Sequence, residues 1–273
     1  MPQPGTVWLI TGGASGVGAA TATLAVARGQ RVAVADINLD GARAVCQRLG
    51  EGAVPISLDV RDPEQWERTL DDVWKRFGRL DILVNNAGLI HVGFTVDLPI
   101  EKLRHMVDVN VIGVVNGMRT AVPRFLAQSA GHVINIGSLA GFVPMPGQAL
   151  YAGTKHAVRA FTHGCALELR RTPVRFTLVC PAAIDTPMLR QQIGSEAATL
   201  SFADAALTAE QVADAVWCAA QEQPSEILLP RARGEFLRIG GVFPGIVRRL
   251  LGGAEARGRK AIERRRREQE SKT

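Results

Sequence analysis

The sequence predicts an α/β fold in which a parallel sheet of seven strands is doubly wound, with helices on both faces. Short runs rich in β-branched residues alternate with longer helical patterns along most of the 273 residues, and this alternation is typical of parallel sheets. The runs are continuously apolar, as expected for strands that are buried on both faces. The predicted strands are Val7–Thr11, Arg31–Ala35, Val54–Leu58, Leu80–Val84, His132–Ile136, Val174–Val179 and Glu226–Leu229.

Helical patterns occupy the segments between these strands. One of them begins with proline, which is favoured in the first turn of a helix. Right-handed crossovers between parallel strands place a ligand crevice at the carboxyl ends of the strands. The predicted helices are Ala19–Arg28, Leu39–Leu49, Pro63–Phe77, Ile100–Gln128, Ala152–Arg170 and Thr208–Ala220.

The distribution of charge divides the chain near residue 231. Residues 1–230 hold 19 Lys or Arg and 21 Asp or Glu, whereas residues 231–273 hold 13 and 5. We therefore predict one domain over 1–230 and a basic, helical C-terminal extension over 231–273. The slightly acidic body gives no reason to expect a nucleic-acid partner. The extension could lie on an anionic membrane, pack on a neighbouring subunit or form a solvated helix.

Cysteine and histidine usage indicates a reduced protein without a metal site. The four cysteines form no C-x-x-C pair, and the five histidines lack the spacing of metal ligands. No apolar run reaches the roughly 18 residues of a membrane span, and we find no signal peptide. These observations predict a cytoplasmic protein, with peripheral membrane contact through the basic extension as an open alternative.

A glycine-rich turn follows the first predicted strand. Its sequence is TGGASGVG, Thr11–Gly18, and a helix comes next. Glycines allow the backbone to approach a pyrophosphate closely, and the N-terminus of a helix presents free N–H groups to it. The spacing G-x-x-x-G-x-G differs from the commoner dinucleotide fingerprint. A glycine-rich turn without any ligand is the alternative.

An acidic residue, Asp36, stands at the end of the second strand. A carboxylate in this place can accept hydrogen bonds from both ribose hydroxyls of NAD and would repel the additional phosphate of NADP. No Arg or Lys occurs within the glycine turn or directly after Asp36 to bind that phosphate. The alternative is an acid that caps the next helix. We expect NAD as the cofactor, with NADP disfavoured.

Three residues form a candidate proton-transfer site. Tyr151 is the only tyrosine, and Lys155 follows at i+4, so both share one face of a helix. A nearby ammonium and an oxidised nicotinamide ring would both favour the phenolate of Tyr151. Ser138, at the end of the fifth strand, could hold the substrate oxygen. Each residue alone could be structural: a Tyr–Lys pair on a helix is common, and Ser138 could cap a turn.

Taken together, these motifs resemble the short-chain dehydrogenase/reductase family, in its single-domain branch. The resemblance spans about residues 6–230 and implies a Rossmann-type fold and hydride transfer with NAD. It is carried by TGGASGVG, Asp59, Asn85-Asn86-Ala87-Gly88, Asn110, Ser138, Tyr151-x-x-x-Lys155 and Pro181 with Thr186.

The resemblance implies roles for the catalytic set Asn110, Ser138, Tyr151 and Lys155. Tyr151 would exchange the proton of the hydroxyl group and Ser138 would steady the carbonyl oxygen. Lys155 would bind the nicotinamide ribose. Asn110 would hold a water that relays protons from Lys155 to solvent.

The resemblance also implies the cofactor site. Asp59 and Val60 would lie against the adenine, and Thr186 would hold the carboxamide of the nicotinamide. The family usually has glycine where Ala182 stands, so the space near the nicotinamide ring could be narrower. The implied cofactor-binding residues are Gly12, Ser15, Gly16, Val17, Gly18, Asp36, Asp59, Val60, Asn86, Ala87, Gly88, Tyr151, Lys155, Pro181, Ile184 and Thr186.

The segment Pro187–Ala206 lies where the family covers its substrate, and it has few charges. With Ile90–Phe94 and Leu139–Pro146 it predicts a largely apolar secondary alcohol or ketone, such as a steroid, a terpenoid or a fatty-acyl derivative. We expect His91 to be structural, because Tyr151 supplies the proton chemistry.

The sequence also bears on alternative functions and on the oligomeric state. A dinucleotide-binding redox sensor without turnover is the alternative function. A sugar-nucleotide epimerase or dehydratase would usually need a larger C-terminal domain than this chain has. The family implies a homodimer or homotetramer formed through the helices near 101–128 and 152–170.

Overall fold

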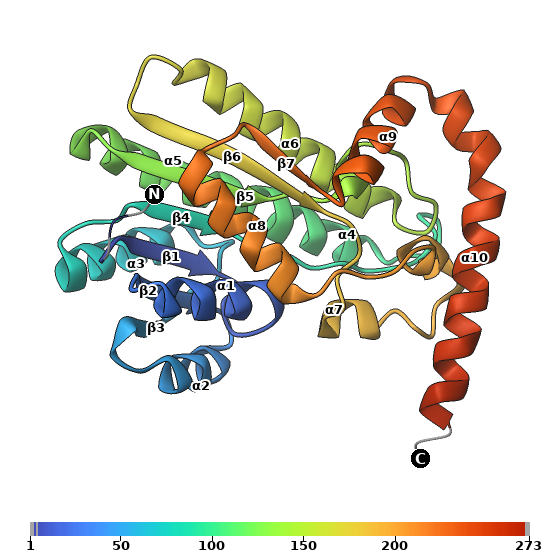
Figure 1. Cartoon of the computed structure of the whole chain (residues 1–273), viewed down its shortest axis with the longest axis horizontal. Coiled ribbons are helices and arrows are strands. Elements are labelled where there is room, and N and C mark those ends of the chain that lie inside the picture. The colour runs from blue at the N-terminus through green and yellow to red at the C-terminus, as the bar shows by residue number, and fades with distance from the viewer. Residues whose placement is uncertain (1–2, 4, 271–273) are drawn as a thin grey trace.

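The computed structural model describes residue 3 and residues 5–270, without the side chains at 244, 246, 247 and 268–270. Its architecture is a sheet between two layers of helices (Figure 1). The strands are Val7–Thr11 (β1), Arg31–Asp36 (β2), Ala53–Ser57 (β3), Ile82–Asn85 (β4), Gly131–Ile136 (β5), Val174–Pro181 (β6) and Glu226–Leu229 (β7). The helices are Gly16–Ala27 (α1), Leu39–Leu49 (α2), Pro63–Phe77 (α3), Ile100–Val107 (α4), Gly113–Gln128 (α5), Ala149–Glu168 (α6), Pro187–Arg190 (α7), Ala209–Glu222 (α8), Arg231–Val242 (α9) and Pro244–Glu270 (α10).

The sheet confirms the predicted fold class. All seven strands are parallel and lie in the order β3-β2-β1-β4-β5-β6-β7. The chain reverses its direction of winding between β1 and β4, and ligands bind at such a switch point, beyond the carboxyl ends of the strands. Here the Thr11 hydroxyl accepts hydrogen bonds from the backbone N–H groups of Asn86 and Ala87, both at 3.0 Å. The two segments that flank the switch point are therefore tied together.

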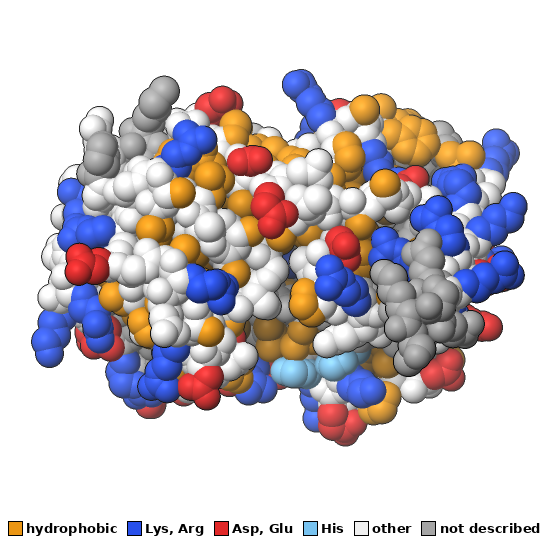
Figure 2. Space-filling model, turned by 60° about the horizontal axis from the view of Figure 1, so that its bottom comes forward, with side chains coloured by type: hydrophobic (Ala, Val, Ile, Leu, Met, Phe, Trp, Pro, Cys, Tyr) orange, Lys and Arg blue, Asp and Glu red, His pale blue; other side chains and the backbone are white. Residues whose placement is uncertain are grey.

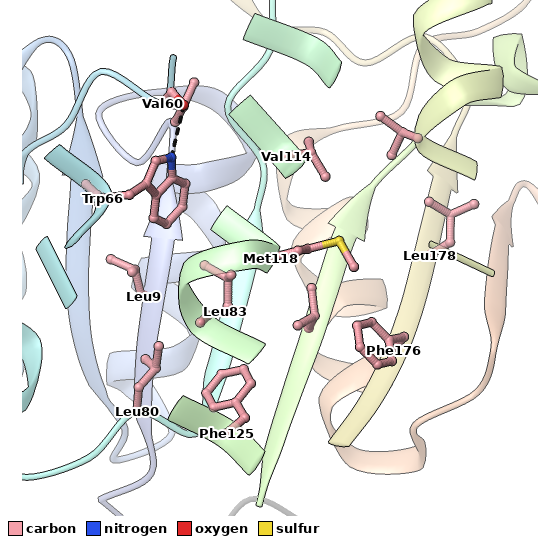
Figure 3. Close-up of a cluster of buried hydrophobic side chains, with 14 of the residues drawn as sticks. Leu9, Val60, Trp66, Leu80, Leu83, Val114, Met118, Phe125, Phe176 and Leu178 are labelled. Carbon is pink, nitrogen blue, oxygen red and sulfur yellow. Dashed lines mark hydrogen bonds between the residues drawn. The ribbon is translucent and has the colours of Figure 1, made fainter. Parts of the chain in front are cut away.

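Each face of the sheet is buried by three long helices. α1, α2 and α8 cover one face, where residues such as Ala22 and Val216 are fully buried. α3, α5 and α6 cover the other face, and Figure 3 shows part of the core beneath them, with Trp66 of α3 and Met118 of α5. There the indole Nε1 of Trp66 donates a hydrogen bond of 3.0 Å to the carbonyl of Val60, and this bond fixes the segment that follows β3 to the core. Burial of these side chains supplies the main stabilising free energy of the fold.

The structure corrects the prediction of one long helix over Ile100–Gln128. That region is α4, a π-helical turn over Asp108–Ile112, and then α5. Inside the turn, the Asn110 amide donates to the carbonyl of Leu89 at 2.9 Å and accepts from its N–H at 2.8 Å. A π-helical turn is often found at a functional site, and the sequence pattern did not predict it here, because its contacts join Asn110 to residues far away in the chain.

Some predicted boundaries also shift. The first helix begins at Gly16 instead of Ala19, and α6 begins at Ala149 instead of Ala152. The fourth strand begins two residues later than Leu80. Sequence patterns give helix and strand ends only to within a few residues, because caps and turns decide them.

The basic extension packs against its own chain. Glu226 of β7, whose side chain is 7% exposed, forms ion pairs with Arg238 of α9 and with Arg159 of α6. Further along, Ile262 of α10 is buried against Phe202 and its neighbours in the segment before α8. The described part of the extension is therefore neither detached nor fully solvated.

Candidate functional site

The turn between β1 and α1 is shaped as a cradle. Gly12 and Gly16 have φ angles of +64° and +52°, which favour glycine. A Cβ on Gly18 would overlap the carbonyl oxygen of Gly12, and a Cβ on Gly12 would lie 2.9 Å from the Cα of Ala87. Only glycine therefore allows the turn to fold this tightly at the switch point.

The N-terminus of α1 has the properties of an anion-binding site. The cap residue, Ser15, makes no side-chain hydrogen bond to the helix, and no acidic residue stands in the first turn. The first N–H groups of the helix are therefore available, together with the positive end of the helix dipole. Ser15, Gly16 and Val17 all line the same cavity. This arrangement fits the diphosphate of a dinucleotide.

Asp36 lies beside the glycine turn that forms the cradle. Its carboxylate accepts hydrogen bonds from the N–H groups of Ala14 at 2.9 Å and Asn38 at 2.8 Å. The cap of α2 is Asn38, whose side chain accepts from Gly41. Asp36 therefore does not cap the helix. It lines the cavity and orients the glycine turn.

A second acid lies at the end of β3. Asp59 forms an ion pair with Arg61, and hydrogen bonding from that guanidinium keeps the pKa of Asp59 below its usual value. Both residues line the cavity with Val60. The sequence analysis missed Arg61, although it stands directly after the motif residues Asp59 and Val60.

The proton-transfer residues converge from two elements. Ser138 follows β5, where its hydroxyl oxygen accepts from the N–H of Ala140 at 3.1 Å. Tyr151 lies in the first turn of α6 and Lys155 one turn later, with the ammonium 5.8 Å from the centre of the phenol ring. The Lys155 ammonium donates a hydrogen bond of 2.9 Å to the carbonyl of Ile136. All three candidate side chains line one cavity.

Burial dominates the electrostatics of this trio. It raises the pKa of Tyr151 to about 12, although a hydrogen bond with Ser138 acts in the opposite direction. Burial also lowers the pKa of Lys155 to about 8. Burial therefore raises the pKa of the phenol in the protein alone, and a lowering by the Lys155 ammonium together with an oxidised nicotinamide ring stays a prediction. Near pH 10 the Lys155 amine is largely neutral and offers little charge to the phenol.

Asn110 lies beside this trio and does not line the cavity. Its amide is engaged with the backbone of Leu89 and donates to the hydroxyl of Thr154 at 3.2 Å. The side chain thus fixes the loop after β4 against α6. Gly88 lies in that loop, and a Cβ added at this position would be 3.3 Å from the Asn110 oxygen and 3.8 Å from the Lys155 nitrogen.

One cavity of about 970 Å³ connects the cradle with the trio. Gly18 and Asn110 are the only residues of the expected site that do not line it, and both support it from behind. The expected residues that line it are Gly12, Ser15, Gly16, Val17, Asp36, Asp59, Val60, Asn86, Ala87, Gly88, Ser138, Tyr151, Lys155, Pro181, Ile184 and Thr186.

The far wall of the cavity contains residues that the sequence analysis did not assign. His105 of α4 lines it and lies 3.4 Å from His91, which packs behind it. Arg233 and Phe236 of α9 and Arg257 of α10 also line it. The basic extension that carries them was predicted from the sequence, but its position over the site was not.

The described residues offer neither a metal centre nor a membrane-spanning helix. They contain no group of three or more His, Cys, Asp or Glu side chains arranged to hold a metal ion. None of their helices is both long and apolar enough to cross a bilayer.

Comparison with known proteins identifies the family. A family model described as short chain dehydrogenase matches residues 6–197. The chain belongs to the short-chain dehydrogenase family. As a member it is an oxidoreductase that acts on CH–OH groups.

Two relatives of this short-chain dehydrogenase act on cyclic alcohols according to their names. A 3-alpha-(or 20-beta)-hydroxysteroid dehydrogenase of Mycobacterium bovis is 36% identical over 184 residues, which cover 67% of this chain and 71% of the relative. A 2,5-dichloro-2,5-cyclohexadiene-1,4-diol dehydrogenase of Sphingobium indicum is 38% identical over 187 residues, which cover 67% and 75%.

Solved structures share the fold of this short-chain dehydrogenase and hold either form of the cofactor. A short-chain dehydrogenase/reductase from Burkholderia phymatum in complex with NAD has a TM-score of 0.80 at 27% identity, covering 87% of this chain and 93% of that one. A serine dehydrogenase in complex with NADP+ has a TM-score of 0.75 at 28% identity, covering 82% and 94%. Nicotinamide dinucleotides are thus the cofactors of these neighbours, and the choice between the two differs among them.

Proposed function

We propose that this short-chain dehydrogenase is NAD-dependent and interconverts a largely apolar secondary alcohol and its ketone. The observation that carries the proposal is the convergence of Ser138, Tyr151 and Lys155 on a cavity whose other end is the glycine cradle. A bound NAD+ supplies the acceptor for the hydride of the alcohol carbon.

The protein's own residues would manage the proton and the oxygen atom. The Tyr151 phenolate takes the proton of the hydroxyl group while the C–H bond is lost as hydride, so that alcohol and NAD+ become ketone, NADH and one proton. Ser138 donates a hydrogen bond to the substrate oxygen and holds it beside the phenol. Lys155 has further N–H donors beside its bond to Ile136, and these would bind the nicotinamide ribose and add positive charge near the phenol.

The preference for NAD is supported by Asp36. Its carboxylate lies on the cavity wall beside the cradle, and it is held there by two backbone N–H groups. The cation nearest to it in sequence on this wall, Arg61, is already paired with Asp59. A further phosphate at the ribose would meet negative charge without a free guanidinium to compensate it.

The apolar character of the substrate is supported by the walls near the trio. Val143, Met145, Met188, Leu189 and Leu200 line the cavity there. The names of the two relatives, a hydroxysteroid dehydrogenase and a cyclohexadienediol dehydrogenase, agree with such a substrate. A redox sensor without turnover is not favoured, because binding alone needs no proton-transfer residues beside an apolar space.

Assembly and location remain expectations from the family and the surface. Ile112, Leu126 and Leu167 are exposed apolar residues on the helices through which we expect a homodimer or homotetramer. Phe236 and Phe243 are exposed on α9 and directly after it, which agrees with peripheral membrane contact of a cytoplasmic protein.

The test is a panel of secondary alcohols assayed for NADH and NADPH formation. We expect turnover with NAD+ and a shift toward NADP+ in Asp36→Ala. Tyr151→Phe should bind NAD+ normally and lose about 100-fold or more in turnover, which is the usual contribution of general acid–base catalysis. Substantial turnover by Tyr151→Phe would refute the proton-transfer assignment, and an unchanged cofactor preference in Asp36→Ala would refute the role of Asp36.

A further inference from the structure

The C-terminal extension, residues 231–273, contributes one wall of the cavity. This extension lies outside residues 6–197, which match the family model. The lining residues of the extension that matter here are Arg233, Phe236, Leu237, Arg249, Leu251 and Arg257.

The helix that carries two of these arginines is anchored in place. A Cβ on Gly258 would overlap the carbonyl oxygen of Thr199, so α10 crosses the preceding segment at backbone contact. One turn later Ile262 is buried, and Arg266 donates a hydrogen bond of 3.0 Å to the carbonyl of Gly194. Arg257 is therefore presented to the cavity by a helix in a defined position (Figure 1).

Positive charge exceeds negative charge on this wall. Arg233 forms an ion pair with Asp204, and both residues line the cavity. Burial lowers the pKa of Arg233, and the positive charge of Arg257 lowers it further. Within the described part of the chain, neither Arg249 nor Arg257 has an acidic partner. In Figure 2 lysine and arginine side chains gather over the region of α10, at the right.

Surplus guanidinium groups beside apolar side chains on this wall of the cavity favour a particular ligand. A wholly apolar molecule would remove water from these charges and give nothing in exchange, which is unfavourable. A ligand with an anionic end would pair with them, and the planar guanidinium matches carboxylate and phosphate oxygens in two-point hydrogen bonding. Leu237 and Leu251 would contact its apolar body.

We propose that Arg257 and Arg249 bind an anionic group, a carboxylate or a phosphate ester, at the end of the apolar alcohol or ketone. The identity of the reacting end rests on the proposed function. The anionic end is what the extension would select, and it narrows the substrate class to amphiphilic anions such as hydroxy or keto fatty acids and alkyl phosphates.

Binding of unreactive probes tests this proposal without turnover. Calorimetric titration of straight-chain alkanoates of several lengths, their methyl esters and the matching alkyl phosphates, with and without NADH, compares the charged and neutral ends directly. We expect at least one anion to bind about tenfold or more tightly than its neutral partner, as a charge-assisted contact implies. The tighter of the two anions identifies the headgroup.

Variants of the two arginines then test whether these residues cause the preference for anions over neutral esters. Arg257→Gln combined with Arg249→Gln should remove it, and Arg257→Lys should retain part of it. Arg259→Gln is the matched control, because Arg259 lies on the same helix and does not line the cavity. Circular dichroism confirms that each variant is folded.

Three outcomes would overturn the proposal: equal affinity for anions and esters, a preference that survives in the folded double variant, or an equal loss in Arg259→Gln. Failure of the proposed function is a separate result. It would appear as absence of NADH formation with every alcohol, whatever the probes show.

Discussion

The single tyrosine of this chain makes the ionisation of the proposed catalytic phenol directly observable. Because Tyr151 is the only tyrosine, the ultraviolet absorbance of tyrosinate reports this one group. Burial raises the pKa of Tyr151 to about 12, against 10.0 for a free phenol. Two units correspond to about 3 kcal/mol against the phenolate.

The expected titration follows from these values. Near pH 10 a free tyrosine is about half ionised, whereas Tyr151 in the protein alone should be ionised to about 1%. Positive charge close to the phenol lowers its pKa. Saturating NAD+ should therefore shift the titration to lower pH, and NADH, whose nicotinamide ring is neutral, should shift it less.

The measurement is a difference spectrum between the wild type and Tyr151→Phe, recorded at each pH with the same cofactor. This difference removes the absorbance of the cofactor and of the four tryptophans. Far-ultraviolet circular dichroism must stay constant, because a phenol with a raised pKa weakens folding as the pH rises above about 10. Half-ionisation near pH 10 in the folded protein alone would refute the burial argument. An absence of any NAD+ effect would refute the placement of Tyr151 beside the nicotinamide.

Further predictions concern stability and the cradle. Burial lowers the pKa of His132 to about 4, so between about pH 6.5 and 4 the unfolded chain binds a proton that the folded chain does not. The free energy of unfolding should therefore fall by up to about 3 kcal/mol as the pH decreases through that range. Urea titrations should show a flatter pH dependence of this free energy in His132→Gln, and an unchanged slope would contradict the prediction. Gly18→Ala should weaken NAD+ binding about tenfold or more, because the new methyl group overlaps backbone atoms of the cradle. Gly164→Ala, at a helix position with open space, is the control, and equal NAD+ affinity in both variants would exclude the cradle as the NAD+ site. Glu226→Gln should lower the free energy of unfolding by about 3 kcal/mol, since it leaves several cations around a nearly buried site; a loss below about 1 kcal/mol would mean that these ion pairs contribute little.

Much of this protein follows from local sequence. The apolar runs of the seven strands and the glycine spacing of Thr11–Gly18 were sufficient to predict the sheet and its crevice. Both depend on short-range requirements: a strand that is buried on two faces must be apolar, and a turn with positive φ angles at Gly12 and Gly16 requires glycine. The convergence of the trio on that crevice could be expected from the order of the motifs along the chain, whereas the role of the three residues in proton transfer stays a prediction.

Other features could not be predicted, because they depend on contacts between distant segments. The interruption of α4 and α5 at Asn110 is set by the backbone of Leu89 and by Thr154. The direction in which the pKa of Tyr151 moves is set by burial, which only the packed structure defines.

The sequence alone determined the fold class, the cofactor cradle and the identity of the residues suited to proton transfer. The tertiary structure decided where the C-terminal extension lies. From the sequence alone it could lie on an anionic membrane, pack on a neighbouring subunit or form a solvated helix. The close approach of Gly258 to Thr199 and the burial of Ile262 show that its described part packs on its own chain, and contact of its exposed face with a membrane or another subunit stays a prediction. The physical reason is that an apolar stripe specifies only that it must be covered, whereas shape and hydrogen bonding determine what covers it.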